Sequence, residues 1–325
     1  MSFPVITGAS ATVTGNSVEF VVDVDITNAT ESTTIYVEYS VSGSSITYYA
    51  SYSHETNTGY LYSYYFNASN LNYGTTYTFR PCLEDADGNI VGQYNGSFYI
   101  EPEATILNLT NSVSQNTVTF TVEVKYNIGL YESNYNVNVF LDLTSAANYG
   151  YSAIFQTVSN IGRIYTYTFI YSGLIYGESF KCLARVSRGT TIIDSLTNNF
   201  NTPLDTSNII DVVFKPSVHK AKSETETTLV YLSDVYKIKI TYDKNQITST
   251  SKFKETTIHT TNLNNNEVFE ITLTNLNDNT KYNCIIELYN MSVTMLPDGQ
   301  LLDTFTTQFK TLNGFKLWMY LWYRL

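Results

Sequence analysis

The chain has 325 residues and a formal net charge of -11, with 15% aromatic residues, 29 of them Tyr, and only 14% charged residues. Tyr, Thr, Val and Ile suit the pleated, half-buried surface of a strand, so this composition predicts an all-β protein. The acidic balance, and the lack of a Lys/Arg run interleaved with aromatic residues, argue against a nucleic-acid partner.

The first hundred residues alternate between apolar and polar side chains in several short segments. The segment from Val18 to Asp25 alternates strictly, a period of two that buries one face of a strand and exposes the other. Further strands are expected near Val5 and at 35–41, 46–52 and 60–66. Gly88 is expected to supply the positive φ of a tight hairpin.

One local pattern occurs three times, at intervals of about one hundred residues. It is Leu71-Asn-Tyr-Gly-Thr-Thr-Tyr77, then Leu174 to Phe180, then Leu276 to Tyr282. A tight turn that ends in an aromatic residue is typical of the tyrosine corner of a two-sheet sandwich, where the ring fills the end of the core and its hydroxyl binds the turn. The repeat predicts three domains, followed by a short apolar C-terminal segment: 1–102, 103–203, 204–313 and 314–325.

The second domain is expected to repeat the first, whereas the third diverges. In the third, a short second strand is expected at 228–232, a third strand at 235–242, and a hairpin at Pro297-Asp-Gly299. Pro102 and Pro203 mark very short linkers. Because short linkers limit bending, we expect a semi-rigid rod.

Each domain contains a single cysteine: Cys82, Cys182 and Cys284. Each lies in the strand after the corner and has no partner within its domain, which argues against a disulfide scaffold and for folding in a reducing compartment. Nor do the residues after Met1 show the basic and apolar regions of a signal peptide.

The corner, the segment Glu84-Asp85-Ala-Asp-Gly88 and the closing Phe98 resemble a fibronectin type III or closely related immunoglobulin-like domain. The resemblance covers nearly the whole chain, although Phe20, Phe120 and Leu229 stand where such domains usually carry a tryptophan. It implies a binding or spacing module, because the fold carries no chemistry of its own. Histidines, cysteines and carboxylates do not stand at ligand spacing, so no catalytic residue, metal site or cofactor is expected.

The first domain contains ten acidic residues against Arg80 alone, a net charge of -9, and it is rich in tyrosine. Alternation forces some rings of a strand outward, and exposed tyrosines make good binding surfaces. The alternative is that tyrosine is simply a good strand residue. The candidate ligand surface, expected on two adjacent strands, comprises Tyr48, Tyr49, Tyr52, Tyr60, Tyr62 and Tyr64.

The segment 314–325 is not explained by the sandwich pattern. On a helix, Phe315, Trp318, Met319, Trp322 and Leu325 would share one face. As a strand, Phe315, Leu317 and Leu321 would point opposite to the two tryptophans. We expect Phe315, Leu317, Trp318, Met319, Trp322 and Leu325 to anchor the protein in an assembly, since burying several such side chains is favourable. Two alternatives are that the segment caps the third domain, or that it lies at a membrane surface, the less favoured of the two.

Tandem fibronectin-like domains normally decorate the outside of cells, yet this chain shows no export signal and its cysteines are unpaired. A virus particle resolves the conflict, because its proteins fold in the host cytoplasm and leave by lysis, and the sequence resembles components of tailed bacteriophages that carry such domains. The leading hypothesis is a non-enzymatic virion protein of capsid, tail or fibre that is oligomeric, binds other virion proteins through its C-terminal segment, and adheres to a host-surface glycan or protein. The alternative is a bacterial cell-surface or scaffold protein that binds carbohydrate or protein. A membrane partner is not expected.

Overall fold

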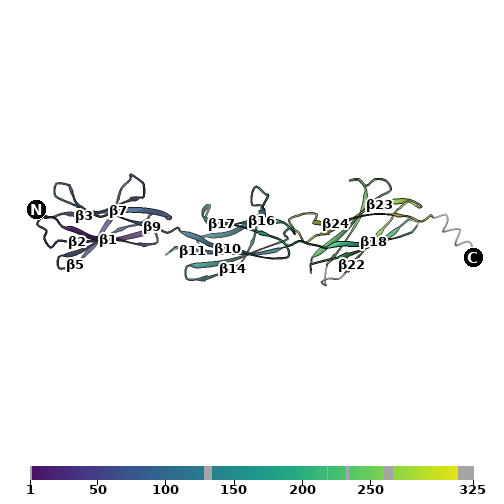
Figure 1. The fold of residues 1–325 in the computed structure, drawn as a ribbon, viewed down its shortest axis with the longest axis horizontal. Helices are drawn as coiled ribbons and strands as arrows, with labels where there is room; N and C mark the ends of the chain where they lie inside the picture. The colour runs from purple at the N-terminus through teal and green to yellow at the C-terminus, as the bar shows by residue number, and fades with distance from the viewer. Residues whose placement is uncertain (1, 128–133, 218, 232–233, 260–265, 314–325) are drawn as a thin grey trace, which may run out of the picture.

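The computed structural model describes residues 2–127, 134–217, 219–231, 234–259 and 266–313. Within these ranges the chain forms antiparallel sheets and no α-helix, so the all-β prediction is confirmed. The sheets form three tandem fibronectin/immunoglobulin-like sandwiches, here called sandwiches 1, 2 and 3, which lie in line as an extended rod (Figure 1). Among the described residues no helix is long and apolar enough to cross a bilayer.

Sandwich 1 has two sheets, one with the order β1-β2-β6-β5 and the other built on β4-β3-β7-β8, with β9 also paired to β7. The first order is that of the ABED sheet of an immunoglobulin constant domain. The strands are β1 (Val5–Thr14), β2 (Ser17–Asp25), β3 (Thr34–Val41), β4 (Tyr48–Tyr49), β5 (Ser51–Thr58), β6 (Leu61–Ala68), β7 (Thr75–Glu84), β8 (Ile90–Gln93) and β9 (Gly96–Ile100).

Sandwich 2 repeats this arrangement with the sheets β10-β11-β15-β14 and β13-β12-β16-β17. Its last strand is continuous, whereas the last strand of sandwich 1 is divided into β8 and β9. The strands are β10 (Ala104–Ser114), β11 (Thr117–Tyr126), β12 (Asn136–Leu143), β13 (Tyr151–Ser152), β14 (Ile154–Ile161), β15 (Ile164–Ser172), β16 (Ser179–Arg188) and β17 (Thr191–Asn201).

Sandwich 3 differs in the place of its fourth strand. Its sheets are β18-β19-β22 and β21-β20-β23-β24, so β21 stays beside β20 instead of crossing to the other sheet as β5 and β14 do. The strands are β18 (Asn208–Pro216), β19 (Ala221–Thr228), β20 (Val235–Asp243), β21 (Lys252–His259), β22 (Asn266–Leu273), β23 (Lys281–Asn290) and β24 (Gln300–Lys310).

The repeated corner has the expected role in sandwiches 1 and 3. The hydroxyl oxygen of Tyr77 accepts a hydrogen bond from the backbone N–H of Asn72 at 2.9 Å, and Tyr282 makes the equivalent contact at 2.8 Å. In sandwich 2 the position is Phe180, which carries no hydroxyl. All three rings stack on the closing phenylalanine of their sandwich at centroid distances of 5.3, 5.4 and 5.3 Å.

The cysteines are free and buried, as predicted, but they are not equivalent. Cys182 and Cys284 belong to the cores of sandwiches 2 and 3. Cys82 instead pairs with Tyr36 on the outer face of sheet β4-β3-β7-β8, because residues 77, 79 and 83 are the ones that turn into the core. Although the three cysteines are about one hundred residues apart, Cys82 therefore lies on the outer face of its sheet, whereas Cys182 and Cys284 face the core.

Two sequence predictions about strands are wrong. The strand expected at 46–52 is divided, since Ala50 separates β4 from β5 in the opposite sheet. The second strand of sandwich 3 is β19, not 228–232, and the side chains that it buries are Ala221, Ser223, Thr225 and Thr227. Such small and polar residues give no apolar alternation for a sequence pattern to detect.

The hairpin predicted at Pro297-Asp-Gly299 does join β23 to β24, but these residues end a long loop, residues 291–299. This loop reaches back to sandwich 2, where Met295 is buried in the core cluster of that sandwich. The Met295 N–H donates to the Gly173 carbonyl at 3.2 Å, and Asn116 donates to the Ser292 carbonyl at 3.0 Å. The joint between sandwiches 2 and 3 is therefore a packed interface.

Other contacts strengthen this second joint. Tyr176 stacks on Tyr231 at 4.7 Å and donates its hydroxyl proton to Asp234 at 2.9 Å. Burial first, and then Asp234, raise the pKa of Tyr176. The side-chain amide of Gln300 makes two hydrogen bonds to the backbone of Tyr176. Its oxygen accepts from the Tyr176 N–H at 2.9 Å, and its nitrogen donates to the Tyr176 carbonyl at 3.1 Å.

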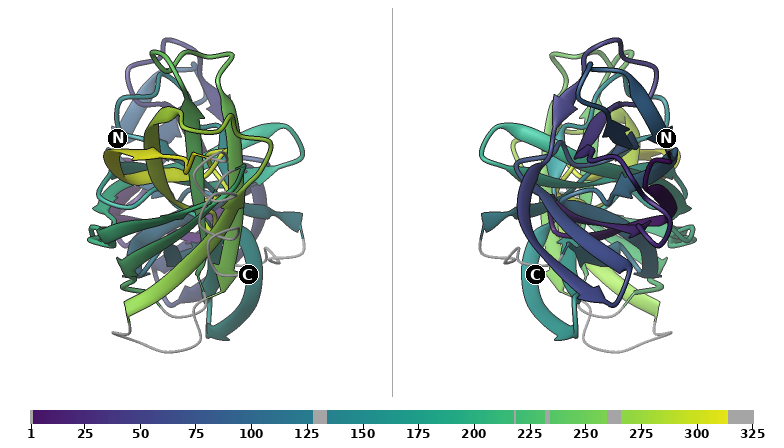
Figure 2. Two further views of the ribbon diagram at one scale, coloured as in Figure 1. Left: turned by 90° about the vertical axis from the view of Figure 1, so that its right-hand side faces the viewer. Right: turned by 90° about the vertical axis from the view of Figure 1, so that its left-hand side faces the viewer.

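The joint between sandwiches 1 and 2 relies on the linker carboxylates. Lys125 lies 3.2 Å from Glu101, and Arg188 lies 3.1 Å from Glu103. Beside the linker is a cavity of about 200 Å³, which Pro102 helps to line. Viewed end-on, the three sandwiches nevertheless overlap in one compact outline, so the rod is nearly straight (Figure 2).

Candidate functional site

The six candidate tyrosines of sandwich 1 do not form one surface on two adjacent strands, as the sequence predicts. Tyr48 and Tyr49 lie on β4, Tyr52 on β5, Tyr60 in the turn before β6, and Tyr62 and Tyr64 on β6. Because the chain changes sheet at Ala50, the β4 pair belongs to one sheet and the rest to the other.

Tyr52, Tyr62 and Tyr64 lie on the core-facing side of sheet β1-β2-β6-β5, since each stands opposite a buried core residue in the ladder. Tyr62 and Tyr64 stack at 6.0 Å, and Tyr52 meets the buried Phe66 edge-on at 5.8 Å. Burial raises the pKa of Tyr64, with smaller effects from Glu55 and the two neighbouring tyrosines. Two of these three rings are thus half-buried strand residues, while Tyr52 and Tyr60 are exposed.

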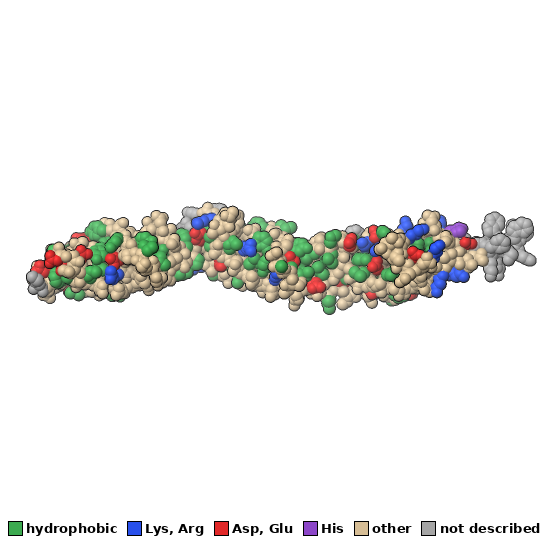
Figure 3. Space-filling model, turned by 90° about the horizontal axis from the view of Figure 1, so that it is seen from above, with side chains coloured by type: hydrophobic (Ala, Val, Ile, Leu, Met, Phe, Trp, Pro, Cys, Tyr) green, Lys and Arg blue, Asp and Glu red, His purple; other side chains and the backbone are tan. Residues whose placement is uncertain are grey.

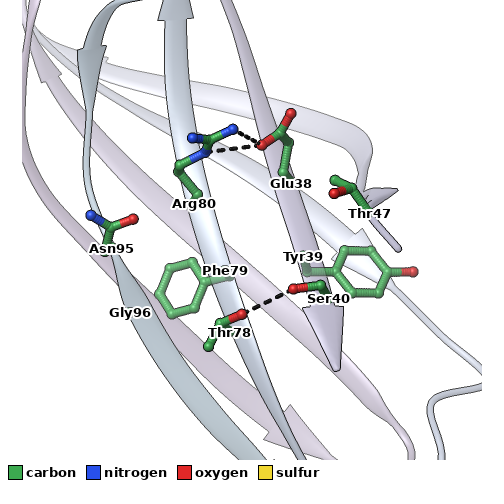
Figure 4. Close-up of a pocket in the computed structure, with 9 residues that line it drawn as sticks. All are labelled: Glu38, Tyr39, Ser40, Thr47, Thr78, Phe79, Arg80, Asn95 and Gly96. Atoms are coloured by element: carbon green, nitrogen blue, oxygen red, sulfur yellow. Dashed lines mark hydrogen bonds and ion pairs between the residues drawn. The ribbon is translucent and has the colours of Figure 1, made fainter. Parts of the chain in front are cut away.

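The other sheet carries a more structured polar site on its outer face. Glu38 pairs across the ladder with Arg80, and Ser40 with Thr78. The Arg80 Nε donates to Glu38 Oε2 at 3.0 Å, and the Ser40 and Thr78 hydroxyl oxygens lie 3.0 Å apart (Figure 4). The hydrogen bond to Glu38 raises the pKa of Arg80 above its ordinary value, so the guanidinium stays charged.

The interruption of the last strand opens a cavity above these pairs. β8 ends opposite Cys82 and β9 begins opposite Phe79, which leaves Tyr94 and Asn95 outside the ladder. The result is a shallow cavity of about 280 Å³ lined by Glu38, Tyr39, Ser40, Thr47, Thr78, Phe79, Arg80, Asn95 and Gly96 (Figure 4). We call it the sandwich 1 cavity.

Gly96 is required by this geometry. A Cβ at this position would lie 2.3 Å from the Phe79 ring, a distance that real Cβ atoms do not adopt. The Phe79 ring packs on the central Phe20 of the core at 5.1 Å, so it has no freedom to withdraw. The small residue thus lets the interrupted edge strand close over the core beside the cavity.

An exposed aromatic ring flanks the cavity. Tyr49 is 66% exposed, lies opposite Glu38 across the ladder, and meets Tyr36 edge-on at 5.9 Å. Donors and acceptors beside an exposed ring can bind a polyhydroxylated or peptide ligand, with the ring supplying apolar contact and the polar groups orientation. Sequence reasoning missed the Glu38–Arg80 pair. The available signal was that Arg80 is the single basic residue of the first 102.

The candidate anchor residues Phe315, Leu317, Trp318, Met319, Trp322 and Leu325 lie outside the described residues. Within the part of the chain that the structure describes, no group of three or more His, Cys, Asp or Glu side chains is arranged to hold a metal ion. His54 is instead stacked on Tyr65 at 4.2 Å, and His219 bonds to the Leu276 carbonyl.

No family model matches the chain, and no curated protein matches it. Among solved structures, it is similar to the chicken CNTN1 FN1-FN3 domains, with 13% identity over 96% of this chain and 99% of that chain and a TM-score of 0.28. The strand pairing described above is what establishes the sandwiches.

Proposed function

We propose that this protein is a non-enzymatic structural component of a virus particle, of the bacteriophage capsid, tail or fibre type, which folds in the host cytoplasm and acts in the virion. The observation that supports this proposal most directly is the rod of three sandwiches (Figure 1). The joint between sandwiches 2 and 3 is packed by the 291–299 loop. A rod of this kind holds its two ends apart, which is the mechanical task of a spacer. Three buried free thiols suit folding in a reducing compartment.

The two ends of the rod differ in charge. Sandwich 1 has ten acidic residues and one basic residue, whereas residues 204–325 contain thirteen acidic and twelve basic residues. Figure 3 shows acidic side chains at the tip of sandwich 1 and many basic side chains on sandwich 3. We assign sandwich 1 to the outward end, where its charge is screened by solvent, and the segment 314–325 to attachment within an oligomeric assembly.

Truncation tests this polarity. Removal of residues 1–102 should leave incorporation into particles intact, whereas removal of 314–325 should leave a folded rod that no longer joins them. Immunogold electron microscopy of particles measures both. Failure of the first truncation to incorporate would reverse the polarity, and a rod found on no particle would favour the alternative, a cell-surface or scaffold protein.

The adhesin role is assigned to the sandwich 1 cavity and Tyr49, with a host-surface glycan or protein as the ligand. The variants Arg80→Ala and Tyr49→Ala should each lower adsorption of protein or particles to host cells at least several-fold. Phe253→Ala, which removes a similarly exposed ring on sandwich 3, is the control. Unchanged adsorption in both variants would remove the cavity from consideration while leaving the spacer role untouched.

A further inference from the structure

Sandwich 3 gathers basic side chains at the end that lies away from sandwich 2 (Figure 3). The turns and strand ends there, residues 216–222, 243–252, 274–281 and 310–313, contain six lysines and two carboxylates. Backbone hydrogen bonds of 3.1 to 3.2 Å join the first, third and fourth of these segments, so they form one continuous surface. This end of the rod therefore attracts negative charge, in contrast to sandwich 1.

Two of these lysines stand directly opposite each other. Lys281 begins β23, Lys310 ends β24, and the register of the two strands pairs them. Both are exposed on the outer face of the sheet, because the alternate residues Tyr282 and Phe309 belong to the core. Like charges directly opposite in a ladder are destabilising. We call Lys281 and Lys310 the lysine pair.

A second pair of opposed lysines in sandwich 3 is already neutralised. Lys215 and Lys222 face each other across β18 and β19. Glu224 bridges them, at 2.5 Å from Lys215 and 3.3 Å from Lys222. In the part of the chain that the structure describes, no carboxylate takes this place at the lysine pair. Asp243, on the adjacent strand, instead accepts hydrogen bonds within its own loop at 3.0 and 3.1 Å.

The lysine pair lies at the end of a wide groove on the same face of the sheet. The groove has a volume of about 990 Å³, and its lining includes Gln246, Ile247, Asn283, Ile285, Thr306 and Gln308. Asn283 and Gln308 form the ladder row next to the lysine pair, and their amides are hydrogen-bonded at 2.7 Å. Asn283 also donates to the Asn245 carbonyl at 2.6 Å, which fixes the loop that forms one wall. Such amide and hydroxyl groups can bind the backbone of an extended segment.

We propose that this groove binds an extended acidic segment of the assembly partner, with one carboxylate held between Lys281 and Lys310 as Glu224 is held between Lys215 and Lys222. The inference rests on the proposed function, which places the attachment at segment 314–325, shortly after Lys310 in sequence. It also agrees with the polarity of the rod, because an acidic partner is repelled by sandwich 1 and attracted by this end.

The groove favours a protein over a nucleic acid. None of its described lining residues is aromatic, so it lacks the stacking surface that single-stranded nucleic acids use. The chain as a whole is also acidic, with a net charge of -11. A protein segment needs only the carboxylate site of the lysine pair and the hydrogen-bonding groups of the groove.

Peptide binding to the full chain tests the site. The probe is a fluorescein-labelled oligoglutamate peptide, and its anisotropy during titration with protein gives the dissociation constant. Lys281→Gln with Lys310→Gln should weaken binding about tenfold, because charge-assisted hydrogen bonds are lost. The matched control, Lys215→Gln with Lys222→Gln, removes the same charge from the pair that Glu224 already bridges and should bind like wild type.

Three outcomes of this titration would overturn the proposal. The first is a wild-type protein that does not bind the peptide, and the second is an equal loss in the two double variants. The third is a single-stranded oligonucleotide of equal charge that binds more tightly than the peptide and loses its binding in the Lys281→Gln, Lys310→Gln variant, because the groove would then be a nucleic-acid site.

A charge reversal separates docking from general attraction. Lys310→Glu supplies a carboxylate directly opposite Lys281. The variant should therefore have a higher melting temperature, because an opposite-charge pair replaces a repulsive one, and should no longer bind the peptide. Lys252→Glu makes the same change at another exposed lysine of this end and should bind normally. Equal loss of binding in both variants would mean that net charge alone governs it.

Incorporation into particles provides a separate measurement. Lys281→Gln with Lys310→Gln should lower the number of rods per particle, counted by immunogold labelling, relative to the Lys215→Gln, Lys222→Gln control. Equal incorporation would overturn the proposal and leave the virion role intact. A wild-type rod found on no particle would overturn the virion role, and the peptide titration would then decide the site by itself.

Discussion

At the scale of single residues, the corner hydroxyl is a defined source of stability. Replacing Tyr77 with Phe leaves the ring stacked on Phe98 but removes the acceptor for the Asn72 N–H. We expect the free energy of unfolding of sandwich 1 to fall by about 1 kcal/mol, the net value of one such hydrogen bond. Denaturant unfolding measures it, with the exposed Tyr94→Phe as the control. Equal stabilities for the two variants would contradict the role of the corner.

The buried thiols predict an alkaline weakening of the fold. Burial raises the pKa of Cys182 from 9.0 to about 11, so between these values the unfolded state binds fewer protons than the folded state. The contribution is complete below pH 9 and is lost as pH rises to 11, reducing the free energy of unfolding by about 2 kcal/mol. Cys182→Ala should be less stable at pH 7 but should show a smaller loss between pH 8.5 and 11 by calorimetry. An unchanged slope would contradict the assignment.

At the scale of elements, the second joint depends on a glycine. Gly173 has φ +86°, and a Cβ there would lie 2.0 Å from the Thr294 hydroxyl oxygen in the docked loop. We expect Gly173→Ala to displace the 291–299 loop and to destabilise the joint by about 1 to 3 kcal/mol. Small-angle scattering should then show a broader distribution of rod lengths.

Gly162 offers a matched control for this substitution. It also has a positive φ, +62°, but nothing lies within 4 Å of a Cβ placed there. Gly162→Ala therefore carries the backbone strain without the clash and should leave the joint unchanged. Similar scattering curves for the two variants would show that backbone strain, rather than loop docking, governs the effect.

At the scale of the whole molecule, the two joints should bend differently. The first relies on the partly exposed ion pairs of Glu101 with Lys125 and Arg163, whereas the second buries Met295 and Tyr176. Exposed ion pairs contribute less than about 1 kcal/mol and are screened by salt, while apolar burial is not. We expect 1 M salt to increase bending at the first joint only. Negative-stain class averages measure both angles, and equal bending would refute the difference.

The sequence by itself determined the sandwich fold, the three-fold repeat and the rod, because each depends on patterns that are local. Period-two alternation defines a strand such as β2, the corner motif marks each sandwich, and short linkers restrict the joints. Of the candidate site, the sequence predicted the exposed Tyr49 that flanks the cavity but none of the nine residues that line it. The segment 314–325, predicted as an anchor, lies outside the described residues.

Only the tertiary structure decided which sheet receives the fourth strand, that Glu38 meets Arg80 beneath an interrupted edge, and that the 291–299 loop enters sandwich 2. Each of these joins residues far apart in the chain, and none follows from a local period. The β5 and β21 segments show the reason: both read as strands, but their sheet is chosen by competition between two partners that the fold brings near. The pairing register of the strands and the docking of the 291–299 loop are therefore set only when the core assembles.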